Sequence, residues 1–200
     1  KPMRRVTRSQ TDKLKRSAWE IYQHLEEEIC TKPATTVLLG DSLIQNFVHH
    51  SNLVKRLGST ANLGIGGDKI EHVLWRVKNG SFPKDCRFVI LHVGTNNLKR
   101  DPPSRIVGGV RAICQAINKR HPGVKIAISS ILPRGDADDL GSKITKVNSG
   151  LRGVMEAEMV IIHKAGFQQN LYRTDFIHLN HPGYVEFCDG LEKAICQVGC

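Results

Sequence analysis

The feature that most constrains the fold is a regular alternation between short apolar runs and segments with helical periodicity. The run over 88–93, Phe-Val-Ile-Leu-His-Val, is apolar on both faces, which is typical of a buried parallel strand. Strands that alternate with helices predict an α/β fold, a three-layer α/β/α sandwich around a five-stranded parallel sheet. The predicted strands are 35–39, 61–63, 88–93, 125–129 and 159–162, and the predicted helices are 44–48, 70–77, 104–119 (with Ser104 as N-cap), 142–158 and 183–196.

Length and composition fit one domain with a core of its own, since the chain has 200 residues and 40% of them are hydrophobic. None of the six cysteines is in a Cys-x-x-Cys spacing, which disfavours a zinc ribbon or a thioredoxin motif. A chain of this size needs no disulfides, so we expect an intracellular, cytoplasmic location. No apolar run is long enough to cross a bilayer, and no signal peptide is apparent. The start at Lys1 rather than Met is what an excised fragment would show.

The positive charge is unevenly distributed along the chain. The formal net charge is +10, and residues 1–16 carry seven basic residues and one acidic residue. We therefore divide the chain into a flexible basic arm over 1–16 and a domain over 17–200, which begins within a helix predicted for 12–30. Such an arm suits an anionic partner, either nucleic acid or an acidic membrane surface. A solvated arm without a partner is the alternative.

Unusual polar segments follow the first three predicted strands, and a further one precedes the last helix. Ligands of parallel sheets bind outside the carboxyl ends of the strands, so these segments are the candidate site. They are 40–42 (Gly-Asp-Ser), 64–68 (Gly-Ile-Gly-Gly-Asp), 94–97 (Gly-Thr-Asn-Asn) and 175–178 (Asp-Phe-Ile-His).

Together these segments contain the groups needed for acyl transfer. The Ser42 hydroxyl is a weak nucleophile until a base takes its proton, and His178 is the candidate base. Asp175 can accept a hydrogen bond from the second imidazole nitrogen and fix the tautomer. A tetrahedral oxyanion requires donors at about 2.7–3.1 Å. We expect these from the backbone N–H groups of Ser42 and Gly64 and from the side-chain amide of Asn96.

Simpler interpretations exist for several of these residues. Ser42 or Asp41 could cap the following helix, and an asparagine after a strand could be a turn residue only. His178, His181 and Asp175 could form a small metal cluster, but the sequence offers no further ligand nearby, so we expect no metal and no cofactor.

The four segments, in this order and spacing, resemble the SGNH (GDSL-type) hydrolase superfamily. Longer strings are similar to one branch, the intracellular platelet-activating-factor acetylhydrolase type Ib catalytic subunits. These strings are 62–68 (Asn-Leu-Gly-Ile-Gly-Gly-Asp), 72–76 (His-Val-Leu-Trp-Arg), 93–97 (Val-Gly-Thr-Asn-Asn), 132–135 (Leu-Pro-Arg-Gly) and 178–179 (His-Leu). The resemblance implies a flavodoxin-like fold, no metal, and ester hydrolysis through an acyl-serine, with Ser42, Gly64, Asn96 and His178 as the four named residues and Asp175 completing the triad.

The resemblance also implies an acyl pocket closed by Leu43, Thr95 and Ile177, with room for an acetyl group and little more. Ile177 stands where that branch usually has Leu. The basic arm is foreign to the acetylhydrolases, and a basic arm before such a body resembles the esterase domain in first-open-reading-frame proteins of LINE-type retrotransposons.

The leading hypothesis is therefore a serine esterase for short-chain, acetyl esters, including those of phospholipids. One alternative is a lipid- or nucleic-acid-binding module with incidental esterase activity, and another is a carbohydrate O-acetylesterase. Family likeness further suggests a homodimer or a higher homo-oligomer.

Overall fold

The five predicted strands form a single parallel sheet. The computed structural model describes residues 32–161, 163 and 168–198, so the arm over 1–16 and the helix predicted over 12–30 both lie outside the described residues. The strand order is β2-β1-β3-β4-β5, and every pairing between neighbours is parallel. This confirms the α/β prediction. The strands are β1 (Thr36–Gly40), β2 (Thr60–Gly64), β3 (Phe88–His92), β4 (Lys125–Ser129) and β5 (Met159–Ile161).

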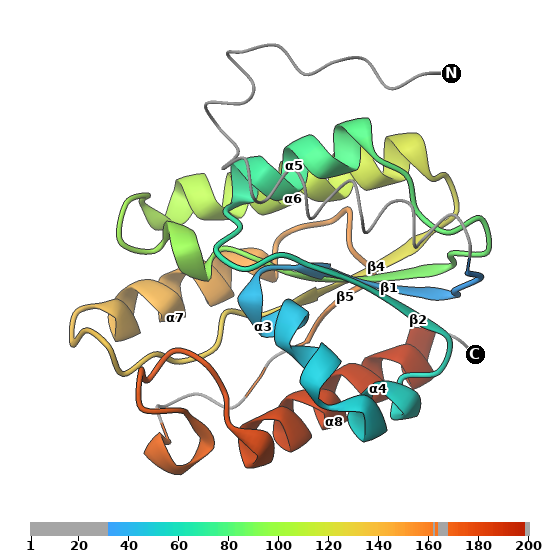
Figure 1. Cartoon of the computed structure of the whole chain (residues 1–200). Helices are drawn as coiled ribbons and strands as arrows, with labels where there is room; N and C mark the ends of the chain where they lie inside the picture. Colours follow the sequence, from blue (N-terminus) through green and yellow to red (C-terminus); the bar gives the residue numbers. More distant parts are fainter. Residues whose placement is uncertain (1–31, 162, 164–167, 199–200) are drawn as a thin grey trace, which may run out of the picture.

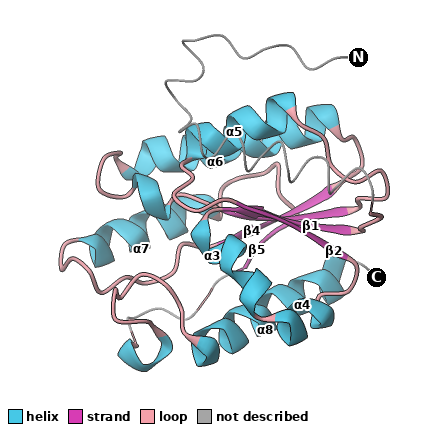
Figure 2. Cartoon of the chain, in the orientation of Figure 1, coloured by secondary structure: helices cyan, strands magenta, loops and turns pink. Residues whose placement is uncertain are grey.

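Helices cover both faces of the sheet and complete the three layers (Figure 1). One face is covered by α5 (Ile70–Asn79), α6 (Pro103–Arg120) and α7 (Leu140–Leu151). The other is covered by α3 (Ser42–Gln45), α4 (Ser51–Arg56) and α8 (His181–Val198). Figure 2 shows these two helical layers on either side of the strands. Short 3-10 helices in the described connections are η1 (Asn46–His49), η2 (Thr95–Asn97) and η3 (Gln169–Leu171).

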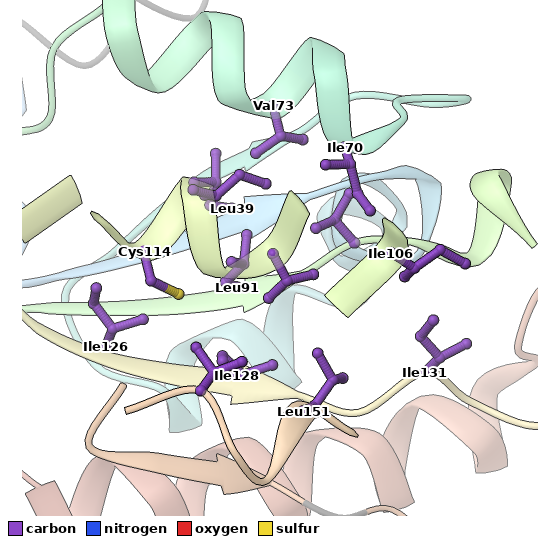
Figure 3. Packing of buried hydrophobic residues seen from close by; sticks show 14 of the residues in the cluster. Leu39, Ile70, Val73, Leu91, Ile106, Cys114, Ile126, Ile128, Ile131 and Leu151 are labelled. Carbon is purple, nitrogen blue, oxygen red and sulfur yellow. The ribbon is translucent and has the colours of Figure 1, made fainter. Parts of the chain in front are cut away.

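The core lies on both sides of the sheet because side chains alternate along each strand. Leu39, Leu91 and Ile128 point to the face of the sheet that α5, α6 and α7 cover, in the cluster shown in Figure 3. Their neighbours Leu38 and Ile90 belong to the opposite cluster, beneath α8. A central strand buried on both faces accounts for the continuous apolar run that predicted β3.

Several helix boundaries differ from the predictions. The segment predicted as 142–158 ends at Leu151 in α7, because the chain must turn back to pair along β4, where the Glu158 N–H donates to Ile126 O. The prediction for 44–48 becomes α3 followed by η1, and α4 was not predicted. Ser104 lies inside α6, and the N-cap is Pro102. Pro103 at the first helical turn needs no N–H partner, which favours this earlier start.

The parallel arrangement brings the predicted polar segments together at one edge of the sheet. The ends of β1, β2 and β3 are in register, with Gly40 opposite Gly64 on one side and opposite His92 on the other. In the described part of the chain no helix is both long and apolar enough to span a membrane.

Candidate active site

Three side chains form a continuous hydrogen-bonded chain at the carboxyl edge of the sheet. Ser42 is the first residue of α3, directly after β1, and its Oγ lies 2.9 Å from His178 Nε2. His178 Nδ1 lies 2.7 Å from Asp175 Oδ2. A hydroxyl, an imidazole and a carboxylate in this order can pass the serine proton to the imidazole and stabilise the cation that forms. The structure thus brings together residues that are 136 positions apart in sequence.

The loop that carries His178 is organised around the Asp175 carboxylate. Its Oδ1 accepts hydrogen bonds from the backbone N–H groups of Ile177 and His178, each at 2.9 Å. Phe176 adopts a left-handed conformation with φ 55°, which is rare for a bulky residue and is a local strain of the kind found at functional sites. Partial burial would raise the Asp175 pKa, but the hydrogen bonds from His178 and Ile177 outweigh it and lower the pKa to about 2. Asp175 is therefore an anion at neutral pH.

Asp41 caps the helix that presents Ser42. Its Oδ1 accepts from the Leu43 N–H at 3.0 Å, which confirms the capping interpretation, while its Oδ2 is buried without a hydrogen-bond partner in the described part of the chain. Burial raises the pKa of Asp41 to about 7, and the nearby Asp68 carboxylate adds to the rise. Asp41 is fully buried, so its role is to stabilise the start of the helix that carries Ser42.

Gly64 is required for packing, but its N–H group is already used. A Cβ on Gly64 would lie 2.1 Å from the Gln45 backbone nitrogen, so only glycine lets β2 end this close to α3. The Gly64 N–H donates to Asn62 Oδ1 at 2.9 Å, and Asn62 Nδ2 donates to Ile44 O. In this arrangement the adjacent asparagine accepts the Gly64 hydrogen, and the role of Gly64 as an oxyanion donor stays a prediction.

The following turn offers free donors instead. Gly66 and Gly67 are exposed, and no acceptor for their N–H groups is found among the described residues. A Cβ on Gly66 would lie 4.0 Å from Ser42 Cβ, so this turn borders the serine, and Gly67 has φ 78°, which favours glycine. Asn96 Nδ2 donates to Asp68 O at 2.9 Å, which orients its amide and leaves its second hydrogen available.

The two asparagines after β3 have different roles. Asn97 is buried and accepts from the Ile70 N–H at 3.0 Å, while its amide contacts the carboxylates of Glu71 and Asp101. It fixes the start of α5. Asn96 is the partly exposed one, and its amide lies beside the glycine turn, as expected for the candidate donor.

The residues predicted to close the acyl pocket flank the candidate catalytic groups. Leu43 and Thr95 are buried, and Ile177 is partly exposed next to His178. Arg134 holds Thr95 by donating to its backbone oxygen at 2.9 Å and to its hydroxyl at 3.1 Å. Arg134 in turn pairs with Asp136 at 2.8 Å.

The metal-cluster alternative receives no support from the residues described. His181 faces His50, with the two Nδ1 atoms 3.1 Å apart, rather than His178. Within residues 32–161, 163 and 168–198, no three His, Cys, Asp or Glu side chains are grouped as metal ligands would be.

The sequence did not predict the residues that hold the backbone segments of the site in place. Asp68 and Arg76 form a buried ion pair, and Asn62 and Arg134 bind backbone carbonyls next to functional residues. The sequence does contain one indication of such a residue. Arg76 lies between Val73 and Val77 on the apolar face of a predicted helix. A charged residue on a buried face needs partners, and this one finds them at the site.

Comparisons with known proteins identify the family. Residues 38–185 match the GDSL-like Lipase/Acylhydrolase family. The chain belongs to this family. It is 32% identical over 181 residues to the human platelet-activating factor acetylhydrolase IB subunit alpha1, with 84% of this chain and 78% of that protein covered. The human subunit alpha2 is 33% identical over the same length and coverage.

Solved structures share the fold at lower identity. A GDSL-like lipase from Bacteroides thetaiotaomicron superposes with a TM-score of 0.74 at 16% identity, covering 90% of this chain and 97% of that one. A carbohydrate esterase family 3 protein from Talaromyces cellulolyticus gives a TM-score of 0.65 at 18% identity, covering 82% and 97%. The protein is accordingly a hydrolase of the GDSL acylhydrolase type, with a resemblance in fold to esterases of different substrates.

Proposed function

We propose that this domain is a serine esterase that removes short acyl groups, acetyl foremost, through an acyl-serine intermediate. The observation that carries the proposal is the chain from Ser42 Oγ through His178 to the Asp175 carboxylate, with contacts of 2.9 and 2.7 Å. An ordinary capping serine needs no such partners.

In the first half-reaction, His178 Nε2 takes the proton as Ser42 Oγ bonds to the ester carbonyl carbon. The carbonyl electrons move onto oxygen, where the N–H groups of Ser42 and the Gly66–Gly67 turn and the amide of Asn96 stabilise the charge. His178 then returns the proton to the leaving alcohol as the ester C–O bond breaks.

Water completes the reaction at the same residues. It loses a proton to His178 and attacks the acyl-serine, and the second tetrahedral intermediate collapses to release the acid and restore the Ser42 hydroxyl. The Asp175 carboxylate remains ionised throughout, because its lowered pKa lies far below neutral. Its part is to hold the imidazole and offset the imidazolium charge.

The substrate proposal joins the pocket residues with the relatives. Leu43 and Thr95 are buried beside Ser42 and Asn96, and bulky neighbours at these positions favour a small acyl group. The relatives are platelet-activating factor acetylhydrolase subunits, so an acetyl ester of a phospholipid is the proposed substrate class. A carbohydrate acetate is the second candidate, since the fold also matches a carbohydrate esterase.

The decisive experiment compares the purified protein with its Ser42→Ala variant on an aryl acetate. We expect turnover to fall by at least about 10⁴-fold, with an unchanged fold by circular dichroism. A fluorophosphonate should label the wild type at Ser42. The matched control is His181→Ala, three residues from His178, which should retain turnover within about threefold. Undiminished hydrolysis by Ser42→Ala contradicts the proposal.

Two further measurements address the substrate and the rival function. Acyl esters from acetyl to octanoyl should be hydrolysed with falling kcat/KM, and a preference for octanoyl contradicts the small pocket. A wild type without turnover favours a binding module. The basic arm over 1–16 lies outside the described residues, and its nucleic-acid or membrane partner stays a prediction, to be tested by deletion and by salt dependence of binding.

A further inference from the structure

Arg76 projects from the buried face of α5 toward the carboxyl ends of β1 and β2. Its side chain is only 3% exposed. Nη1 donates to Leu63 O at 2.9 Å, and Nη2 donates to Gly40 O at 3.2 Å. The guanidinium therefore binds the last peptide groups of two neighbouring strands.

Asp68 neutralises this buried cation. Its Oδ2 accepts from Arg76 Nε at 3.0 Å and from Nη2 at 2.7 Å. Both residues are buried, so the pair carries a large desolvation cost, and charge-assisted hydrogen bonds to fixed acceptors offset it. A buried ion pair of this kind can often be replaced by apolar residues without loss of stability, so stability alone does not explain it.

The contacts of this pair lie next to the three segments of the proposed site that follow β1, β2 and β3. Leu63 precedes and Asp68 follows the turn over 64–67, so the pair holds both ends of that turn. Gly40 stands two residues before the nucleophile, and its oxygen also accepts from the Ile65 N–H at 3.1 Å. Asp68 O accepts from Asn96 Nδ2 at 2.9 Å. One guanidinium thus connects the Ser42, glycine-turn and Asn96 segments.

We infer that the Arg76–Asp68 pair is a positioning device that holds the Gly66–Gly67 turn and the Asn96 amide in register with Ser42. The inference rests on the proposed function, because the value of the register lies in presenting donors to an oxyanion. Such donors act only when held within about 0.5 Å of the productive geometry. Neither residue touches the reacting atoms; both act through the backbone.

The first test is the kinetics of Arg76→Met on an aryl acetate. We expect kcat to fall about 100-fold, as for loss of an oxyanion donor, while KM changes less than about threefold. The matched control is Arg120→Met at the end of α6, where Arg120 donates to two carbonyls at the end of α5, Lys78 O at 2.9 Å and Gly80 O at 2.7 Å. This control also removes a guanidinium that binds backbone carbonyl groups, but far from the site, and it should leave kcat within about twofold.

Conservative and double variants separate positioning from stability. Arg76→Lys keeps the charge but not the fork of donors, so kcat should fall about tenfold with little change in Tm. Asp68→Asn combined with Arg76→Met should cost no more in kcat than the worse single variant, because the two act as a unit. If Arg76→Met does not fold, Arg76→Lys and Asp68→Asn carry the same test.

A readout independent of activity is hydrogen exchange of the segment over 64–70. In Arg76→Lys its amides should exchange about tenfold faster, while those of α6 keep their wild-type rates. The inference is overturned if exchange in this segment is unchanged, or if kcat follows Tm equally in the Arg76 and Arg120 variants. A wild type that hydrolyses no ester defeats the proposed function instead, and the exchange rates still decide whether Arg76 holds the turn.

Discussion

Ser42 and Ser129 both lie within 2.9 Å of a histidine nitrogen at the carboxyl ends of strands in one sheet, yet their surroundings differ in almost every respect. Ser42 is partly exposed, contacts one histidine, and that histidine meets a carboxylate. Ser129 is buried at the end of β4, with Oγ 2.8 Å from His163 Nε2 and 2.9 Å from His92 Nδ1. In the described part of the chain, neither of these two histidines hydrogen-bonds a carboxylate.

The electrostatic consequences are opposite. Burial lowers the pKa of His92 to about 3 and that of His163 to about 4, so neither ring readily accepts a proton. His178 has 28% of its side chain exposed and faces the carboxylate of Asp175, which hydrogen bonds keep anionic at neutral pH. A short serine–histidine distance is therefore insufficient for a nucleophile. Access and a carboxylate behind the base distinguish Ser42 from Ser129.

The largest effect is expected from removing the Asp175 carboxylate, because this group distinguishes the Ser42–His178 pair from Ser129 and its histidines. Asp175→Asn leaves the hydrogen-bonding geometry nearly intact but favours the wrong imidazole tautomer, so kcat for an aryl acetate should fall about 10⁴-fold. The control is Asp189→Asn, which removes an exposed carboxylate of α8 that pairs with Arg56 of α4. This variant should change kcat less than about twofold. Normal activity in Asp175→Asn would show that a carboxylate behind the histidine is not what distinguishes Ser42 from Ser129.

A smaller effect, on stability alone, is expected at the buried pair. Ser129→Ala leaves His92 Nδ1 and His163 Nε2 without their partner, which should lower the free energy of unfolding by about 3 kcal/mol in urea denaturation. Turnover of the folded protein should not change. Ser59→Ala, whose exposed Oγ donates to Pro33 O, should cost less than about 0.5 kcal/mol. Loss of turnover in folded Ser129→Ala would assign Ser129 a catalytic role.

The smallest effect is the acid sensitivity of the buried histidine chain. The folded-state pKa of His92 lies below its unfolded value of 6.5, so the unfolded state binds more protons and stability is lost as pH falls below 6.5. Between pH 6.5 and 5.0, wild type should lose about 2 kcal/mol more than His92→Leu, measured by urea denaturation at both pH values. Asp41, with its raised pKa, acts in the opposite direction but equally in both proteins. Equal losses would contradict the buried, neutral state of His92.

Much of the fold follows from local patterns in the sequence. Short runs rich in apolar residues predicted each strand to within about two residues, most clearly in β3, where burial on both faces leaves little room for polar side chains. The segments after the strands predicted the edge at which Ser42 meets His178, since parallel strands end together. Neither inference needed contacts between distant residues.

Other features were decided only by the tertiary structure. Whether Gly64 or the Gly66–Gly67 turn has free N–H groups depends on Asn62, whose side-chain oxygen takes the Gly64 hydrogen. The end of α7 at Leu151 depends on β4, along which the returning chain pairs. Local propensity contains no information about such partners. A buried backbone N–H or C=O group pairs with whichever acceptor or donor the folded chain places beside it.

The sequence by itself determined the strand–helix alternation and the residue types available at the sheet edge, because burial and turn chemistry act over a few residues. It also placed a serine, a histidine and an aspartate where a triad could form. Only the tertiary structure decided that Ser42 has an accessible histidine with a carboxylate behind it, whereas Ser129 lies between the buried ring of His92 and the partly buried ring of His163, both with lowered pKa. The reason is physical: access to water and the charge beside an imidazole are set by the packing of distant segments, not by neighbours in the chain.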